Sequence, residues 1–175
     1  MLLRTLCILI TTALTASALT EEKINETRAA KAGGKLVVDV DFGTIELVPG
    51  DNDKVVINAY RKIEISSKEK EEEYLRAAPV TITTDGATIT VRATRKDNHL
   101  DWNWHGNSNM NAHYTIHVPA SFNAELETAG GDISAKNLTG NIKAETSGGD
   151  LKFGLLHGSL DAQSAGGDIE IAACD

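Results

Sequence analysis

Apolar and polar residues alternate with a period of two along several short stretches of the chain. This alternation is typical of strands with one buried face. The stretches are residues 35–41, 44–48, 54–65 and 112–118. Two more stretches, 80–84 and 87–94, flank Asp85-Gly86, and Asp-Gly between alternating β-branched residues predicts a hairpin. The pattern therefore predicts an all-β protein whose N-terminal part consists of antiparallel strands.

One segment between these strands departs from the alternation. Ser66 and Glu69 fit a capping box, and the glutamates that follow are strong helix formers. Pro79 ends the segment, because the residue before a proline disfavours the helical conformation. We therefore expect one short helix over about residues 67–77 that packs on the sheet, with its acidic side in solvent.

From residue 122 onward the sequence repeats itself with an 18-residue period and a weaker half-period. Gly-Gly-Asp followed by Ile or Leu occurs three times without an insertion, and self-similarity at a fixed period is typical of stacked architectures. We expect a short β-solenoid, similar to a β-helix, with two strands and two turns in each 18-residue coil. The repeated turn residues are Gly131, Asp132, Gly149, Asp150, Gly167 and Asp168.

The repeat register predicts which side chains face inward. Ile133, Leu151 and Ile169 form one apolar column, and period two places the neighbouring polar residues outside. Cys174 follows Leu156 by one full period in another apolar column, so we expect it to be a small core residue.

The repeated aspartates are candidate ligands for calcium ions. Calcium-binding nonapeptide repeats have a second Gly-x-Asp, and this chain does not, because each Asp directly follows Gly-Gly. We therefore expect the aspartates to accept hydrogen bonds from nearby backbone N–H groups in the turns. No metal site and no cofactor are predicted.

Residues 1–18 have the features of a secretory signal peptide: Arg4, an apolar run over residues 5–14, and the small residues 16–18. The run is too short to span a membrane, so no span is expected after cleavage. Residues 19–34 are polar and are expected to be a leader or linker. The rest divides into an N-terminal β region (35–118) and the repeats (119–175), expected to form one continuous domain.

The net charge of −8 argues against nucleic acid as a partner, because proteins that bind nucleic acid carry a basic surface. Removal of residues 1–18 leaves Cys174 as the one cysteine, so an internal disulfide is excluded.

The most chemically varied stretch is residues 97–109, a long polar loop. Loops of more than about 12–15 residues are often functional or disordered. Its side chains could bind a ligand such as a sugar, or the two tryptophans could cover one end of the core. The candidates are Asp97, His99, Asp101, Trp102, Trp104 and His105.

No motif of a known catalytic site occurs in the chain. His113 and His117 have the spacing of a helical zinc pair, but they alternate with apolar residues on a predicted strand. There they would be about 13 Å apart, too far to share an ion. The sequence therefore predicts a protein without enzymatic activity.

Several segments resemble bacterial adhesin-like domains of unknown function, which are also labelled auto-transporter adhesins. The resemblance rests on Gly-Gly-Lys-Leu at 33–36, residues 41–47, 54–57 and 114–119, and the Gly-Gly-Asp units, and it extends over approximately residues 33–175. It implies a β-helix-like fold, export and no established enzymatic activity. It supplies no catalytic residues.

We therefore expect an exported protein of the periplasm, cell surface or extracellular space. Its expected role is a non-enzymatic binding or scaffold module of the cell envelope, with a glycan or a protein as partner. One alternative is a carbohydrate- or metal-dependent enzyme that uses the 97–109 loop. Another is a structural protein that self-associates through its last, uncapped coil, because an open strand edge can pair with another strand.

Overall fold

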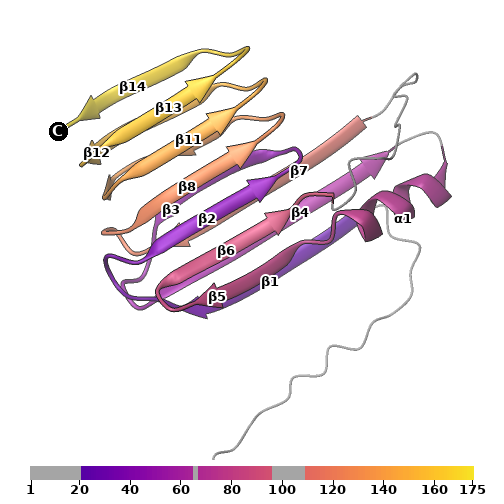
Figure 1. The fold of residues 1–175 in the computed structure, drawn as a ribbon, viewed down its shortest axis with the longest axis horizontal. Helices are drawn as coiled ribbons and strands as arrows, with labels where there is room; N and C mark the ends of the chain where they lie inside the picture. Colours follow the sequence, from indigo (N-terminus) through magenta and orange to yellow (C-terminus); the bar gives the residue numbers. More distant parts are fainter. Residues whose placement is uncertain (1–20, 65–66, 96–108) are drawn as a thin grey trace, which may run out of the picture.

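The computed structural model of the protein describes residues 21–64, 67–95 and 109–175. It contains two mixed β-sheets that face each other, and one helix (Figure 1). The strands of the larger sheet are β1 (Glu21–Ala29), β3 (Thr44–Pro49), β4 (Lys54–Glu64), β7 (Asn109–Val118), β9 (Ile133–Ala135), β10 (Leu138–Thr139), β12 (Leu151–His157) and β14 (Ile169–Cys174). Those of the smaller sheet are β2 (Lys35–Val40), β5 (Thr81–Asp85), β6 (Thr88–Ala93), β8 (Asn123–Thr128), β11 (Ile142–Thr146) and β13 (Leu160–Ser164).

The repeated segments stack in parallel at the predicted offset of one full period. In the larger sheet, Leu151 of β12 pairs with Ile133 of β9 and with Ile169 of β14. In the smaller sheet, β11 pairs with both β8 and β13 at the same offset. Each repeat thus contributes to both sheets: β8, β11 and β13 lie in the smaller sheet, and β9 with β10, then β12, then β14 lie in the larger one. Figure 1 shows the successive repeats as layers that end at β13 and β14.

The prediction of antiparallel N-terminal strands is wrong for β2 and β3. These strands lie in different sheets, and β2 pairs in parallel with β6 and β8, whereas β3 pairs in parallel with β7 and β9. The turn between β2 and β3 carries the chain from one sheet to the other, as the repeat turns do. Ile45 pairs with Ile133, so Gly43 in this turn lies next to Gly131 of the adjacent layer. Antiparallel pairing is found for β1 with β4, β4 with β7, and β5 with β6.

The expected leader over residues 19–34 is also corrected by the structure. Residues Glu21–Ala29 form β1, which pairs antiparallel with β4 from Glu21 opposite Lys62 to Ala29 opposite Lys54. The sequence contains little sign of this strand, because Ile24 is its one large apolar residue. β1 is held by its backbone ladder and by polar contacts of its side chains.

The inward positions of both sheets form one apolar core, which extends from Ile57 of β4 to Phe153 of β12. At one end of the molecule, Tyr74 and Ala78 pack on Ile63 near the end of β4. Both residues belong to the helical segment, so the helix covers one end of the space between the sheets.

Helix α1 (Lys68–Ala77) agrees with the predicted helix. Its N-cap is Ser67, whose hydroxyl accepts a hydrogen bond from the Lys70 N–H at 3.4 Å. Ser66, the residue predicted to begin the capping box, lies outside the described residues.

The last layer differs from the prediction in its burial. Cys174 has the predicted register, opposite Leu156, but it is exposed rather than part of the core. Ile169 and Ile171 of the same strand are 44% and 50% exposed. No further layer lies on β14 within the described residues, so its inward positions lack the neighbours that bury Leu151 and Phe153 one layer below.

Candidate functional site

All six loop residues predicted as a ligand site lie outside the described residues, which omit 96–108. The structure does show how both ends of this segment are held. Before it, Asp41 accepts hydrogen bonds from the backbone N–H and the Nε of Arg95, at 3.2 and 3.1 Å. After it, Asn109 donates to Glu64 at 3.1 Å.

The glycines of the repeat allow the layers to approach closely at one corner. A Cβ atom on Gly149 would lie 2.0 Å from the carbonyl oxygen of Gly131, and one on Gly167 would lie 2.1 Å from that of Gly149. Gly131 has the same relation to Gly43, at 2.3 Å. These contacts involve backbone atoms, which cannot move without separating the strands. The repeated glycine is thus a steric requirement of the stack.

The repeated aspartates connect successive layers at the same corner. The Asp132 Oδ1 accepts a hydrogen bond from the Asp150 N–H at 2.9 Å, and the Asp150 Oδ1 accepts one from the Asp168 N–H at 3.1 Å. The bond from Asp168, with a smaller contribution from Lys152, lowers the pKa of the Asp150 carboxyl below its ordinary value. The aspartates therefore bond to backbone N–H groups, as predicted, but across layers rather than within one turn.

A second ladder at this corner was not predicted. The hydroxyls of Thr146 and Ser164 each donate to a glycine carbonyl of the preceding layer, Gly131 and Gly149, both at 2.9 Å. Thr128 donates to Gly43 in the same way at 3.3 Å. The sequence signal was present, since Thr128, Thr146 and Ser164 follow the 18-residue period.

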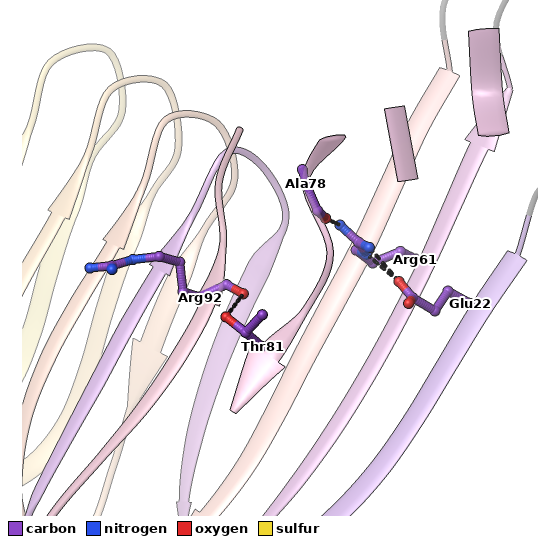
Figure 2. A network of polar contacts seen from close by, with 5 residues as sticks. All are labelled: Glu22, Arg61, Ala78, Thr81 and Arg92. Atoms are coloured by element: carbon purple, nitrogen blue, oxygen red, sulfur yellow. Dashed lines mark hydrogen bonds and ion pairs between the residues drawn. The ribbon is translucent and has the colours of Figure 1, made fainter. Parts of the chain in front are cut away.

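Arg61 lies in the core at one end of the sandwich, with 1% of its surface exposed. Figure 2 shows its guanidinium between Glu22 of β1 and the residue that follows α1. Its Nε and Nη2 donate to the Glu22 Oε2, and its Nη1 donates to the carbonyl oxygen of Ala78 at 2.6 Å. One side chain thus joins β1, β4 and the end of the helix. The sequence contained a signal for it, because Arg61 falls on the inward side of its strand with Val55, Ile57 and Ala59.

Two buried tyrosines lie near this arginine. Burial raises the pKa of Tyr114 to about 12. Burial also raises the pKa of Tyr74, whose hydroxyl donates to Asp41 at 3.2 Å. Both phenols are therefore protonated at neutral pH, and we interpret this cluster as structural.

Over the described ranges, no three histidine, cysteine or acidic side chains are placed to hold a metal ion. His113 and His117 are on β7, where the residues that alternate with them, Tyr114, Ile116 and Val118, are buried. Both imidazoles therefore lie on the outer face of the larger sheet.

That outer face contains a shallow hollow over β1, β4 and β7. Two rows of side chains cross the three strands: Lys23, Tyr60 and His113 in one row, and Asn25, Asn58 and Thr115 in the next. The Asn25 amide donates to the Asn58 Oδ1 at 2.8 Å, and the Lys23 Nζ is 5.6 Å from the centre of the Tyr60 ring. The hollow is lined by Lys23, Asn25, Asn58, Tyr60, His113 and Thr115, together with Ile24 and Ala59.

The lysines of this face are close to carboxylates. Lys62 pairs with Glu64 and Lys54 with Asp51, both at 2.7 Å, and Lys23 is 4.0 Å from Glu21. The contact with Glu64 raises the pKa of Lys62. The outer face of the larger sheet near β1 thus combines an aromatic ring, amides and hydroxyls with balanced charge.

The hollow could not be predicted from the sequence. The alternation over residues 54–65 puts Asn58 and Tyr60 on one face of a strand, but Lys23 and Asn25 fall in the segment expected to be a leader. Three of the eight lining residues, Lys23, Ile24 and Asn25, belong to β1, so the hollow depends on a strand that the sequence did not predict.

No family model and no curated protein matches the chain. Several solved structures are similar to it at low identity. A protein described as a cell adhesion protein, from Clostridium sporogenes, has 8% identity and a TM-score of 0.42, over 86% of this chain and 99% of that one. A protein described as an adhesin, from Parabacteroides distasonis, has 11% identity and a TM-score of 0.36, over 87% of this chain and 66% of that one. Another, from Bacteroides fragilis, has 10% identity and a TM-score of 0.28, over 86% of this chain and 97% of that one. At such values these similarities define neither the fold nor the role of the chain.

Proposed function

We propose that the protein is an exported, non-enzymatic binding module of the cell envelope, and that the hollow on the larger sheet is its contact surface. The observation that carries the proposal is the composition of the hollow. It presents one aromatic ring, two amides, a hydroxyl and an imidazole side by side on a continuous sheet. Such groups recognise a ligand through hydrogen bonds and ring contacts.

The strands under the hollow favour binding because they hold its side chains in place. β4 is paired along its length, with β1 on one side and β7 on the other. Its inward residues Val55, Ile57 and Ile63 are fully buried. A surface fixed in this way loses little conformational entropy when a ligand binds, and this preorganisation raises affinity.

Export is the second part of the proposal, and it rests on the signal-peptide pattern of residues 1–18, which lie outside the described residues. Cleavage after Ala18 would leave β1 intact, since this strand begins at Glu21. Within the described part of the chain, no helix is both long and apolar enough to cross a membrane.

We further propose that the parallel layers form a short β-solenoid of 18-residue coils, with β2 and β3 contributing an additional coil. The offset of one full period, which is the same in both sheets, supports this interpretation. So does the glycine column that continues from Gly167 through Gly149 and Gly131 to Gly43. In this arrangement the coils are a scaffold that carries the contact surface at one end.

The proposed function is tested by sedimentation of the purified chain with the cell-envelope fraction of its source organism. We expect the wild-type chain to sediment with the envelope, and the double variant Tyr60→Thr/Asn58→Thr to lose most of this association. Both substitutions place a β-branched residue on an outward strand position, which a strand accommodates. The association is expected to be lost because the variant lacks the ring of Tyr60 and the amide of Asn58.

The matched control is Val37→Thr, an outward position on β2 in the other sheet. It should sediment like the wild type, and circular dichroism should show that all variants are folded. A wild-type chain that stays in the supernatant would refute the proposed function. Equal sedimentation of all variants would show that the contact surface is elsewhere.

A further inference from the structure

We propose that the hollow binds a neutral, linear glycan, with a pyranose ring stacked on Tyr60 and sugar hydroxyls bonded to the Asn25–Asn58 pair and Thr115. This inference rests on the proposed function and names the ligand class of the same surface. The phenol ring supplies an apolar face for the C–H groups of a sugar. The amides supply both donors and acceptors, which suit hydroxyl groups that can do either.

The two rows of the hollow fit an extended ligand better than a small one. Tyr60 and Asn58 are two residues apart on β4, and each is flanked on β1 and on β7 by another polar side chain. Adjacent strands are about 4.8 Å apart and alternate residues about 6.6 Å apart, so the six side chains cover an area of roughly 10 by 7 Å. The depression is open and shallow, so it admits a chain that continues beyond it in either direction.

The balance of charge favours a neutral glycan over an anionic polymer. Each lysine near the hollow has a carboxylate within 4.0 Å: Glu21 for Lys23, Asp51 for Lys54 and Glu64 for Lys62. An anionic ligand would have to displace these carboxylates or lie beside them. A neutral ligand can bind while these ion pairs stay intact.

The geometry of the sheet disfavours a protein partner. An extended peptide adds to the edge of a sheet through free backbone groups. The edge here is β1, whereas most of the hollow lies on the faces of β4 and β7, which are paired on both sides. A stable protein interface buries about 800 Å² on each partner and has several aromatic or apolar anchors. Tyr60 is the one large aromatic side chain that lines the hollow.

Lys23 lies over the ring that the sugar would contact. Its side chain is 75% exposed, and its ammonium lies over the Tyr60 ring at 5.6 Å from the centre. An exposed contact of this kind contributes only about 0.5–1 kcal/mol. The lysine can therefore move aside when a sugar ring takes its place on Tyr60.

The inference is tested by isothermal titration of the purified chain with chitohexaose, cellohexaose and maltohexaose as neutral probes, and with polygalacturonate as an anionic probe. We expect at least one neutral hexasaccharide to bind, with an affinity that changes little between low and high salt, because uncharged contacts are not screened. Tyr60→Thr should weaken this binding about tenfold, through loss of the ring. Tyr60→Phe keeps the ring and should stay within about threefold of the wild type.

Lys23→Ala distinguishes a neutral ligand from an anionic one. It should strengthen binding of the neutral probe, since it uncovers the Tyr60 ring, whereas it should weaken binding of an anionic ligand. Preference for polygalacturonate, no gain in neutral-probe binding in Lys23→Ala, or an equal effect of Tyr60→Phe and Tyr60→Thr would each overturn the inference. If no hexasaccharide binds while the chain still sediments with the envelope, the glycan inference fails and the proposed function stands.

Discussion

Gly149→Ala is expected to destabilise the protein by about 3 kcal/mol or more, because overpacking that the structure cannot relieve exceeds the usual cost of an added methyl group. The new Cβ atom would lie 2.0 Å from the carbonyl oxygen of Gly131 and 2.3 Å from its carbonyl carbon. To relieve this contact, β12 would have to move away from β9, which breaks the ladder between them. The measurement is the free energy of unfolding in urea.

The matched control is the preceding residue. A Cβ atom on Gly148 would have its nearest neighbour, the carbonyl oxygen of Ala129, at 3.9 Å, which is an ordinary contact. Gly148→Ala should therefore change the free energy of unfolding by less than about 1 kcal/mol in either direction. If the two variants were equally stable, the layers could not be stacked as closely at this corner as the structure has them.

Glu22→Gln is expected to cost about 2 kcal/mol or more, because it leaves the buried guanidinium of Arg61 without its anionic partner. The cost is smaller than for a fully buried pair, since the Glu22 side chain is 33% exposed and water can reach it. The loss should appear as a lower midpoint of urea unfolding. It should also increase hydrogen exchange in β1, because this contact fastens the strand to the core.

Glu26→Gln is the control on the same strand and the same side. Glu26 pairs with Arg28, and both side chains are about one-third or more exposed. Exposed ion pairs contribute little, so this variant should lose about 0.5 kcal/mol or less. Similar losses in Glu22→Gln and Glu26→Gln would mean that burial of Arg61 adds nothing to the stability of the fold.

The repeat made the layered part of the fold predictable from sequence. Its constant period gives the parallel register of β8, β11 and β13 directly, since every turn has the same length. It could not give the burial of Cys174, because burial depends on whether another layer covers the strand. The repeat also gave no sign that β2 and β3 form a layer of the same stack. Their turn at Gly43 lacks the Gly-Gly-Asp sequence and is related to the repeats only by its position in space.

The candidate site was less predictable than the fold. The 97–109 loop was selected for its varied side chains, but the hollow joins β1 to residues more than thirty positions away, as in the pair of Asn25 and Asn58. Asn25 belongs to a strand with too few apolar residues to be recognised by periodicity. The pairing of β1 with β4 is a tertiary effect, because it depends on the edge that β4 presents once the core has formed.

Deletion of residues 141–158 separates the role of the coils from that of the hollow, and the readout is association of the shortened chain with the envelope fraction. This removes β11 and β12, one complete layer, and brings Leu160 to the place of Ile142 beside Ala124, with Gly167 above Gly131. If the coils are a scaffold and the hollow is the contact surface, the deleted chain will fold with reduced stability, shown by circular dichroism and urea unfolding. It will also sediment with the envelope as the wild type does, since β1, β4 and β7 are untouched. A chain that fails to fold would contradict the layered architecture, and a folded chain that no longer binds would contradict the placement of the contact surface.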